Sequence, residues 1–532
     1  MKKSKILILL SLAAIAAGCA LAFAGCKPDT DHGSASADSA SDSFQWITDK
    51  EATCTEAGSK HKECTCCDEI LEQKIIYPKG HNFVGNVCSA CGVTASEGLL
   101  YNFSRDGSGY SVVGIGSCTD KDVVIPSSHQ NLPVTEIGHA AFSQCGITSV
   151  ALPDSVISIN CNAFYDCRSL INVVLPAGVK TIEAAAFAYC NSLTSIIIPD
   201  GVTSIDFYEC TNLTSVALPD SVTSIGFYGC TNLTSISIPD GVTSIGIEAF
   251  RNCSSLTSIS IPNGVTSIGR GAFFSCNSLT SISIPDGVTS IGSDAFYGCN
   301  SLTSIPIPDA VTSIDDRTFY GCSGLTSISI PDGVTSIGSE AFCECSGLTS
   351  VSIPDGVTTI GDRTFYGCSG LTSIALPDGV TTINRDTFGH CSNLTSISIP
   401  ENVTSIGERA FAECISLTSI VLPDGIISVE HSTFVYCSGL TSIILPESLV
   451  SIGNWAFEDC SALTSVYYKG TKAEWDEISI GSTNEALQSA TIYYYSETKP
   501  PLNGDGTAYD GNYWRYAADG VTPVIWKKQT AA

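Results

Sequence analysis

Residues 256–276 read Leu-Thr-Ser-Ile-Ser-Ile-Pro-Asn-Gly-Val-Thr-Ser-Ile-Gly-Arg-Gly-Ala-Phe-Phe-Ser-Cys, and close copies of this stretch occupy most of the 532-residue chain. The final cysteine sets the period: of fourteen steps between its occurrences, twelve are 22 or 23 residues and two are 20. Such a strict period is typical of stacked repeats, so we expect an extended surface rather than a pocketed globule. The repeated cysteines are Cys145, Cys167, Cys190, Cys210, Cys230, Cys253, Cys276, Cys299, Cys322, Cys345, Cys368, Cys391, Cys414, Cys437 and Cys460.

Each copy is predicted to form one turn of a solenoid with its apolar side chains directed inward. Ile259 and Ile261 are two residues apart, so a strand places both on one face, and Ser258 and Ser260 on the other. Proline ends the strand because it has no amide hydrogen for a ladder, and the Asn-Gly or Asp-Gly that follows suits a turn. The other inward positions are Leu256, Val265, Ile268, Ala272, Phe273 and Cys276.

One such turn cannot fold alone. Burial of each Leu, Ile or Phe contributes roughly 1.5–3 kcal/mol, whereas ordering the backbone costs about 1–2 kcal/mol per residue. Only neighbours on both sides make the balance favourable, which predicts a continuous core. The strand-ending prolines and a last strand over 463–468 predict sixteen strands in a parallel sheet. The turns ending at Cys210 and Cys230 lack three residues outside the strand, so we expect the sheet to continue there.

The pattern Leu-x-x-Ile-x-Ile-Pro-x-x-Val-x-x-Ile-x-x-x-Ala-Phe-x-x-Cys resembles the BspA-like class of leucine-rich repeat over about residues 119–495. The resemblance implies a mainly β repeat solenoid, a curved parallel sheet of about sixteen turns, in a bacterial surface protein that serves adhesion or matrix binding. It implies no catalytic residues. The chain also has no Gly-x-Ser-x-Gly, phosphate loop or His-Glu-x-x-His, so we expect no enzyme activity.

The charge balance excludes one class of partner. Lys and Arg number 25 and Asp and Glu number 53, giving a net charge of −28. A chain this acidic cannot neutralise phosphates by counterion release, so we expect no nucleic-acid binding.

The beginning of the sequence predicts export. A lysine-rich start precedes an apolar run to Gly25, as in a signal peptide. Phe23-Ala-Gly-Cys26 resembles a lipobox, so we expect Cys26 to carry a membrane-anchoring lipid, with Cys19 as the alternative. Both sites lack the usual leucine three residues before the cysteine. The polar stretch 27–43 would be a disordered tether. The predicted location is the cell surface, and plain secretion is the alternative.

The 26 cysteines fall into two groups. Those of the repeats project in parallel from successive turns and are odd in number, so we expect reduced, buried, small apolar fillers rather than disulfides. The second group precedes the repeats. Its two Cys-x-x-Cys pairs, at 64–67 and 88–91, have a spacing close to that of a zinc ribbon.

A second zinc-binding arrangement comes from a resemblance to a small module of bacterial surface proteins. That arrangement uses Cys54, Cys64, Cys67 and His81, with the 88–91 pair closing the module or beginning a second copy. Two or three disulfides in a domain too small for a core remain the other interpretation. The role is structural in each case, since four protein ligands leave no open coordination position. The candidate ligands are Cys54, Cys64, Cys67, His81, Cys88 and Cys91.

The strand face opposite the core is the expected binding surface. It lacks the large aromatic and arginine side chains of protein hot spots, which favours a weak, extended, multivalent contact with an extracellular protein or a glycan. A solvated sheet without a ligand is the simpler interpretation. A self-associating envelope or spacer protein is the alternative function. The candidate binding residues are Ser235, Ser237, Ser258, Ser260, Ser281, Ser283, Ser327, Ser329, Ser350 and Ser352.

After the repeats, residues 469–475 predict a short helix and 490–495 a last strand, and the tail 496–532 suits either a hairpin or an aromatic binding patch. We divide the chain into a lipoprotein signal peptide (1–26), a tether (27–43), a Cys-rich zinc-ribbon-like module (44–95), a connector and N-terminal cap (96–118), leucine-rich repeats (119–468), a C-terminal cap (469–495) and an aromatic, glycine-containing tail (496–532).

Overall fold

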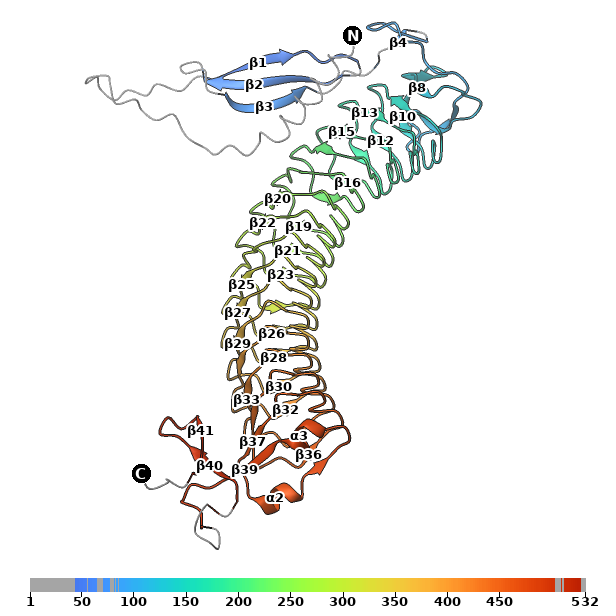
Figure 1. Cartoon of the computed structure of the whole chain (residues 1–532). Coiled ribbons are helices and arrows are strands. Elements are labelled where there is room, and N and C mark those ends of the chain that lie inside the picture. The colour runs from blue at the N-terminus through green and yellow to red at the C-terminus, as the bar shows by residue number, and fades with distance from the viewer. Residues whose placement is uncertain are drawn as a thin grey trace, which may run out of the picture. The chain divides into compact units, whose positions relative to one another are not determined.

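The computed structural model describes residues 44–54, 56–64, 70–76, 81, 83–84, 86–502, 509 and 511–527. These residues form two compact units, one up to Gly264 and one from Val265 onward, and Figure 1 shows the repeat turns of both. The predicted signal peptide, the tether, Cys19, Cys26 and Cys67 lie outside the described residues. Among the described residues, no helix is long and apolar enough to span a bilayer.

Antiparallel strands precede the repeats. A three-stranded sheet comes first, then a hairpin, and then a pair whose second strand begins a parallel ladder of the repeats. These strands are β1 (Phe44–Lys50), β2 (Gly58–Cys64), β3 (Ile70–Ile76), β4 (Phe83–Val84), β5 (Val87–Cys88), β6 (Leu100–Phe103) and β7 (Tyr110–Gly114).

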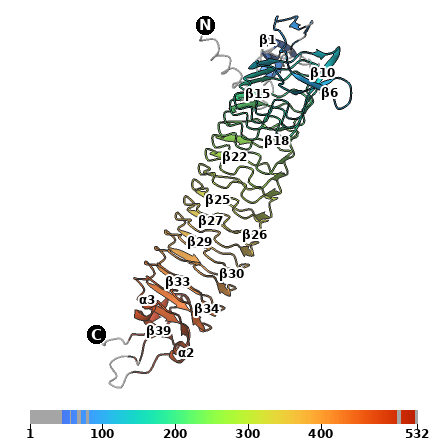
Figure 2. The ribbon, with the colours of Figure 1, turned by 90° about the vertical axis from the view of Figure 1, so that its right-hand side faces the viewer.

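Most repeat turns contribute a strand to each of two parallel ladders, where the sequence predicts one sheet and a short second segment. Strands one repeat apart pair residue for residue, as Ser327 does with Ser350 and Ile328 with Val351. The first ladder contains the Ser-Ile-Ser strands, and the second contains the Ser-Ile strands after the proline turn. Figure 2 shows β22 to β33 of the first ladder along one side of the second unit and β26, β30 and β34 of the second ladder along the other.

The first ladder has six strands in the first unit, β8 (Asp122–Val124), β11 (Ser149–Ala151), β13 (Asn172–Val174), β15 (Ser195–Ile197), β17 (Ser215–Ala217) and β20 (Ser258–Ser260). In the second unit it comprises β22 (Ser281–Ser283), β25 (Ser327–Ser329), β27 (Ser350–Ser352), β29 (Ser373–Ala375), β31 (Ser396–Ser398), β33 (Ser419–Val421), β35 (Ser442–Leu445), β37 (Ser465–Tyr468) and β39 (Thr491–Tyr495).

The second ladder follows β7 in the first unit with β10 (Leu132–Ile137), β12 (Ser158–Ile159), β14 (Thr181–Ile182), β16 (Ser204–Asp206), β18 (Ser224–Gly226) and β19 (Ser244–Ile245), and β9 (Ser128–His129) pairs antiparallel with β10. In the second unit it comprises β21 (Ser267–Ile268), β23 (Ser290–Ile291), β24 (Ser313–Ile314), β26 (Ser336–Ile337), β28 (Thr359–Ile360), β30 (Thr382–Ile383), β32 (Ser405–Ile406), β34 (Ser428–Val429), β36 (Ser451–Ile452) and β38 (Ser479–Ile480).

Two of the sixteen predicted strands are absent from the first ladder. Residues 304–306 form no strand, because Pro306 stands where neighbouring turns have serine and supplies no amide hydrogen. Residues 235–237 contribute only an isolated bridge between Ser237 and Ser260, for which we have no physical account. The two shortened turns pair with each other, β15 with β17 and β16 with β18. The predicted continuation of the sheet is therefore confirmed between these two turns, but within the described range 86–502 β17 pairs with no strand of the following turn.

The third side of each turn is a loop whose amides alternate between two kinds of partner. Asp294 N donates to Asp316 O of the next turn at 3.0 Å, and Phe296 N donates to Thr318 O at 2.9 Å. Between them, Ala295 N donates to Gly292 O within its own turn at 3.2 Å. This alternation needs two left-handed residues in most turns, and non-glycine residues such as Glu340 (φ 58°) and Glu344 (φ 59°) occupy many of these positions. The loops thereby satisfy their backbone donors without forming strands.

The repeat phenylalanines stack inside this third side. In the second unit, successive ring centroids lie 5.4–5.7 Å apart with the ring planes within 19° of parallel. The offset-stacked spacing is the favourable one for aromatic pairs. The predicted fold class, a mainly β repeat solenoid, is confirmed.

The repeat cysteines are free thiols, buried except for half-buried Cys145, as predicted. They are more than apolar fillers. Cys322 Sγ donates to Phe296 O at 3.2 Å, and the same oxygen accepts the Cys299 amide at 3.1 Å. The two donors use both lone pairs of a buried carbonyl. The same bond to the preceding turn, at 2.9–3.2 Å, is made by the thiols of Cys167, Cys190, Cys210, Cys230, Cys253, Cys299, Cys322, Cys345, Cys368, Cys391, Cys414, Cys437 and Cys460.

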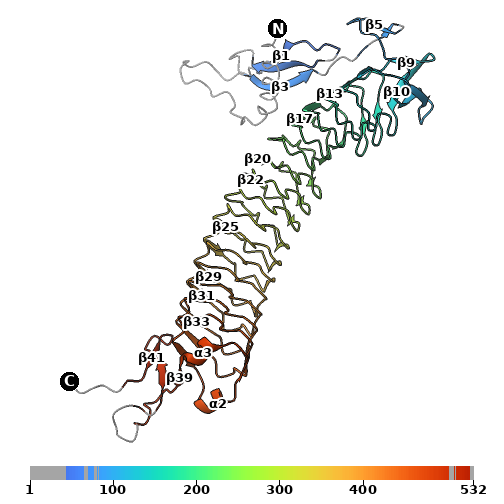
Figure 3. The same cartoon turned by 45° about the vertical axis from the view of Figure 1, so that its right-hand side comes forward.

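Helices and aromatic strands cover the end of the second unit (Figure 3). The predicted helix start is α2 (Lys472–Asp476), with a capping box between Thr471 and Glu474, and α3 (Glu485–Ser489) follows. The predicted last strand is β39, and the tail adds a hairpin, β40 (Tyr513–Tyr516) and β41 (Pro523–Ile525), to its outer edge. Trp514 of β40 is fully buried, and its Nε1 donates to Tyr468 O at 3.0 Å. The tail is therefore a hairpin that joins the core.

Candidate metal centre and binding faces

Four side chains converge in the Cys-rich segment before the repeats. The candidate ligand atoms of Cys54, His81, Cys88 and Cys91 all lie within 4.8 Å of one another. Cys54 follows β1, His81 precedes β4, Cys88 ends β5, and Cys91 lies in the turn after it. Three separate pieces of backbone therefore supply the cluster.

The turn after β5 is a tight knuckle. Cys88 N donates to Val93 O at 2.8 Å, and Gly92 N donates to Cys88 O at 2.9 Å. Gly92 has a φ of 75°, which a residue with a side chain adopts at a cost. These bonds bring the Cys88 and Cys91 thiols to the same side of the turn, the arrangement that a metal-binding Cys-x-x-Cys pair requires.

The distances are close to those of a tetrahedral metal site and far longer than that of a disulfide. Cys54 Sγ and Cys88 Sγ are 3.9 Å apart, and Cys91 Sγ and His81 Nδ1 are 3.2 Å apart. With bonds of about 2.3 Å to sulfur and about 2.05 Å to nitrogen, a tetrahedral zinc ion places its ligand atoms about 3.5–3.8 Å apart. A disulfide requires sulfurs about 2.05 Å apart. Three cysteines and one histidine are a donor set that zinc prefers.

The surroundings favour one thiolate in particular. Cys54, His81 and Cys88 are buried, and Cys91 is exposed. Burial opposes the charge on Cys88, but hydrogen bonds from the Ala90 and Cys91 amides, together with those of the His81 and Cys91 side chains, outweigh it and lower the pKa of Cys88 to about 6. Burial instead raises the pKa of Cys54 to about 12. Cys88 is therefore better prepared than Cys54 to bind a cation as a thiolate.

The cluster combines members of both sequence-based ligand groups. It takes Cys54 and His81 from one and the 88–91 pair from the other. Cys64 is the last residue of β2, and the position of its side chain is not described. The sequence could not predict this grouping, because Cys54 and Cys88 are separated by 34 residues and meet only through the fold.

The predicted serine face has the expected sidedness. On β25, Ser327 and Ser329 are exposed while Ile328 is buried, and β27 repeats the pattern with Ser350, Val351 and Ser352. All ten candidate serines are exposed, including the two of the 235–237 segment, which keeps the alternation without being a strand. The structure thus presents small hydroxyl groups in columns one strand apart.

Aromatic side chains line the third side of the turns, the loop side, which is a different side from the serine face of the first ladder. These aromatic side chains were not predicted from the sequence as a surface. In the first unit Tyr165, Tyr189, Tyr208 and Tyr228 follow one another at centroid distances of 5.4, 5.3 and 4.5 Å. Burial, then hydrogen bonding with Tyr189 and Tyr228, raises the pKa of Tyr208. The recurring Phe-Tyr-x-Cys of the repeat is the signal that could have identified this column.

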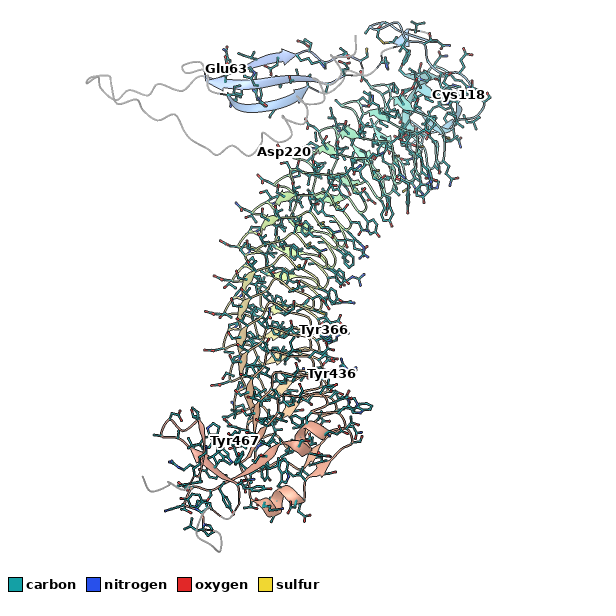
Figure 4. The ribbon with its side chains drawn as sticks, in the orientation of Figure 1. Glu63, Cys118, Asp220, Tyr366, Tyr436 and Tyr467 are labelled. Carbon is teal, nitrogen blue, oxygen red and sulfur yellow. The ribbon has the colours of Figure 1, made fainter. Side chains whose placement is uncertain are left out.

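The second unit has a similar edge. Phe274, Tyr297 and Tyr320 stack at 4.4 and 4.5 Å, and the Arg363 guanidinium lies 4.4 Å from the Tyr366 ring centroid. Figure 4 labels Tyr366 and Tyr436 on this edge. The near-parallel rings of Phe274, Tyr297 and Tyr320 cover one another's faces, whereas Tyr189 meets Tyr165 and Tyr208 edge to face.

The repeat geometry agrees with a comparison of the sequence with protein families. The BspA type leucine rich repeat region matches residues 135–228, 226–346, 312–437 and 381–492. The chain belongs to the BspA-type leucine-rich-repeat family. No curated protein matches this BspA-type chain.

Two solved structures are similar to this chain. A leucine-rich repeat protein from Bacteroides ovatus is 29% identical, with 75% of this chain and 98% of that one covered and a TM-score of 0.59. A leucine rich cell surface protein from Faecalibacterium prausnitzii is 28% identical, with 73% and 99% covered and a TM-score of 0.41.

Proposed function

We propose that this BspA-type protein is a non-enzymatic binding protein of the cell surface, which presents its repeats to a matrix protein or a glycan. The observation that carries the proposal is the exposed serine face, exemplified by Ser327 and Ser329 on either side of buried Ile328. The predicted export signal supports a location outside the cell.

The chemistry of the face defines the kind of ligand. Each serine hydroxyl donates one hydrogen bond and accepts others, so one contact is weak. Columns of such groups recur at about 4.8 Å, the distance between strands. A repetitive polymer that touches many of them gains affinity through multivalency. The proposed ligand is therefore long and rich in hydroxyl or amide groups.

The test probes arrays of glycans and matrix proteins with the exported chain. Ser327→Lys, Ser329→Lys and Ser350→Lys together place three long cations on the first ladder and should weaken binding at least about tenfold. The matched control adds the same charge to exposed positions of the second ladder with Ser290→Lys, Thr359→Lys and Ser405→Lys. An equal loss in both variants, or no ligand at all, contradicts the proposal. Concentration-dependent oligomers without a ligand would instead favour the envelope-spacer alternative.

The proposed membrane anchor is a lipid on Cys26, with Cys19 as the alternative acceptor. Support comes from the lysine-rich start, the apolar run and the Phe-Ala-Gly-Cys sequence. Cys26→Ser should release the protein into the medium and abolish labelling with a fatty acid, whereas Cys19→Ser should not. Retention of Cys26→Ser on the membrane would assign the anchor to another residue.

The proposed cofactor is one structural zinc ion held by Cys54, His81, Cys88 and Cys91. With four protein ligands the ion has no open position for a substrate, so its contribution is rigidity. Metal analysis of the purified chain should find one zinc per molecule, and Cys91→Ser should reduce that content.

A further inference from the structure

Each ladder of the first unit has an outer edge that must be covered. The second ladder ends at β7, which β6 covers as an antiparallel strand. The first ladder ends at β8, and no strand among the described residues pairs with its outer edge. An uncovered edge exposes backbone donors and acceptors, and an uncovered last turn exposes the core.

Ser96 covers the edge of β8. Its amide donates to Val124 O at 2.8 Å, and its Oγ accepts the Val124 amide at 3.1 Å. The same hydroxyl donates to Asp120 Oδ2 at 2.6 Å. Ser96 is buried, and so are Val123 and Ile125 of the adjoining turn. One residue thus satisfies both polar groups of Val124.

The position of Ser96 depends on the knuckle. Ala95 N donates to Asn86 O at 2.7 Å, and Val87 forms a bridge with Thr94. Residues 94–96 therefore run from the β4–β5 hairpin directly to β8. That hairpin has two-residue strands, and so short an element is not stable without further support.

We propose that the zinc bound by Cys54, His81, Cys88 and Cys91 sets the N-terminal cap of the repeats, so that metal loading and the order of the first repeat turn are coupled. The proposal rests on the structural zinc proposed above. The ion fixes Cys88 and Cys91, the knuckle holds residues 94–96, and Ser96 closes the edge of β8. A metal site that precedes the repeats in the sequence thus controls whether the repeat stack is closed at its start.

The test is hydrogen exchange of the full chain, read by mass spectrometry, with zinc bound and after chelation. Removal of zinc should accelerate exchange of the amides in peptides over 121–125 by at least about tenfold. Peptides over β27 and β29 should be unchanged, since repeat turns contact only their neighbours. Cys91→Ser should reproduce the effect without a chelator, whereas Cys118→Ser, outside the cluster, should retain zinc and protection.

Ser96→Ala separates the two parts of the proposal. This variant keeps all four ligands, so it should bind zinc normally while exchange over 121–125 becomes fast. Normal zinc content with unchanged protection of 121–125 after chelation would overturn the cap and leave the zinc proposal standing. Absence of zinc, with a mass lower by two hydrogens per disulfide formed, would overturn the zinc proposal itself.

Discussion

At the scale of single residues, the repeat cysteine matches a need of the backbone. The loop before it leaves the phenylalanine carbonyl facing the next turn with one lone pair free, and the thiol of that next turn supplies a small donor. Alanine would fill most of the volume but leave that lone pair unpaired. The thiols also resist ionisation, because burial raises the pKa of Cys322 and of Cys414 to about 12.

The raised thiol pKa values predict loss of stability at alkaline pH. An unfolded thiol ionises near its ordinary pKa of about 8.5, whereas the folded thiol of Cys322 stays protonated to about pH 12. The stabilisation of the folded state by each neutral buried thiol is thus complete below about pH 8.5. It is lost as pH rises toward 12, by at most about 1.4 kcal/mol per pH unit for each thiol. Urea unfolding at pH 7.5 and 10 checks this.

Variants identify the cysteines as the source. Cys322→Ala together with Cys414→Ala should lower stability at pH 7.5 yet flatten its decline toward pH 10. Ala341→Gly, a buried change without a titrating group, should lower stability equally at both pH values. A decline that the double variant leaves unchanged would argue against the thiols.

Charges at equivalent loop positions show a second residue-scale rule. Asp294 pairs with Arg317 at 3.1 Å, Glu340 with Arg363 at 3.5 Å, and Arg409 reaches Asp386 at 3.0 Å. These positions are one turn apart, so equal charges would face each other at close range. The sign of the charge alternates from turn to turn between Asp294 and Arg409, which removes that repulsion.

At the scale of elements, Pro306 interrupts the first ladder. Pro306→Ser should restore an amide that can pair with a neighbouring turn, which adds about 0.5–1.5 kcal/mol to the free energy of unfolding. The loss of the proline also frees the unfolded chain, which lowers the free energy of unfolding by about 0.4–1 kcal/mol. Pro308 lies in the turn after the strand, so Pro308→Ser should only free the unfolded chain and should add no hydrogen bond. We therefore expect Pro306→Ser to be more stable than Pro308→Ser by about 1 kcal/mol in denaturant unfolding. Equal stability would show that the ladder gains nothing at 304–306.

The β40–β41 hairpin is predicted to stabilise the end of the repeats through Trp514. Its indole is fully buried among Tyr467, Tyr495 and Tyr516. Trp514→Ala should lower the free energy of unfolding of the end of the chain by about 3–5 kcal/mol. Trp455→Ala is the matched control: its side chain is 42% exposed, so a loss under about 1 kcal/mol is expected. Similar losses in both would contradict a capping role for the hairpin.

The sequence reveals these elements unevenly. The strands of the first ladder follow from the alternation in Leu-Thr-Ser-Ile-Ser-Ile and from the proline after it. The loop geometry is harder to predict, because residues such as Glu340 and Glu344 adopt left-handed conformations without the glycine that usually signals them. The metal cluster is harder still, since proximity of Cys54 to Cys88 depends on the folded chain. The strand pattern is easy to predict because it is repeated in about sixteen turns, whereas the contacts of the metal cluster occur only once.

At the scale of the whole molecule, the charge of −28 acts against the compact state. Aspartates after the strand-ending proline recur from turn to turn, as Asp332 and Asp355 do, both exposed. Salt at 0.15 M shortens the range of their repulsion to about 8 Å. We therefore expect the melting temperature to rise between 10 and about 300 mM salt. A melting temperature that falls with salt would mean that the exposed ion pairs outweigh the net charge.

The bonds between turns have a consequence for how such a chain can change its length. Within each unit most turns offer the next the same carbonyls and receive the same amides and thiols, so one such copy can replace another without a new contact. An in-frame duplication or loss of one copy would extend or shorten the serine columns by one step and leave both ends of the stack intact. The number of turns can thus change by mutation without a change of fold, and related strains can carry versions whose serine columns differ in length.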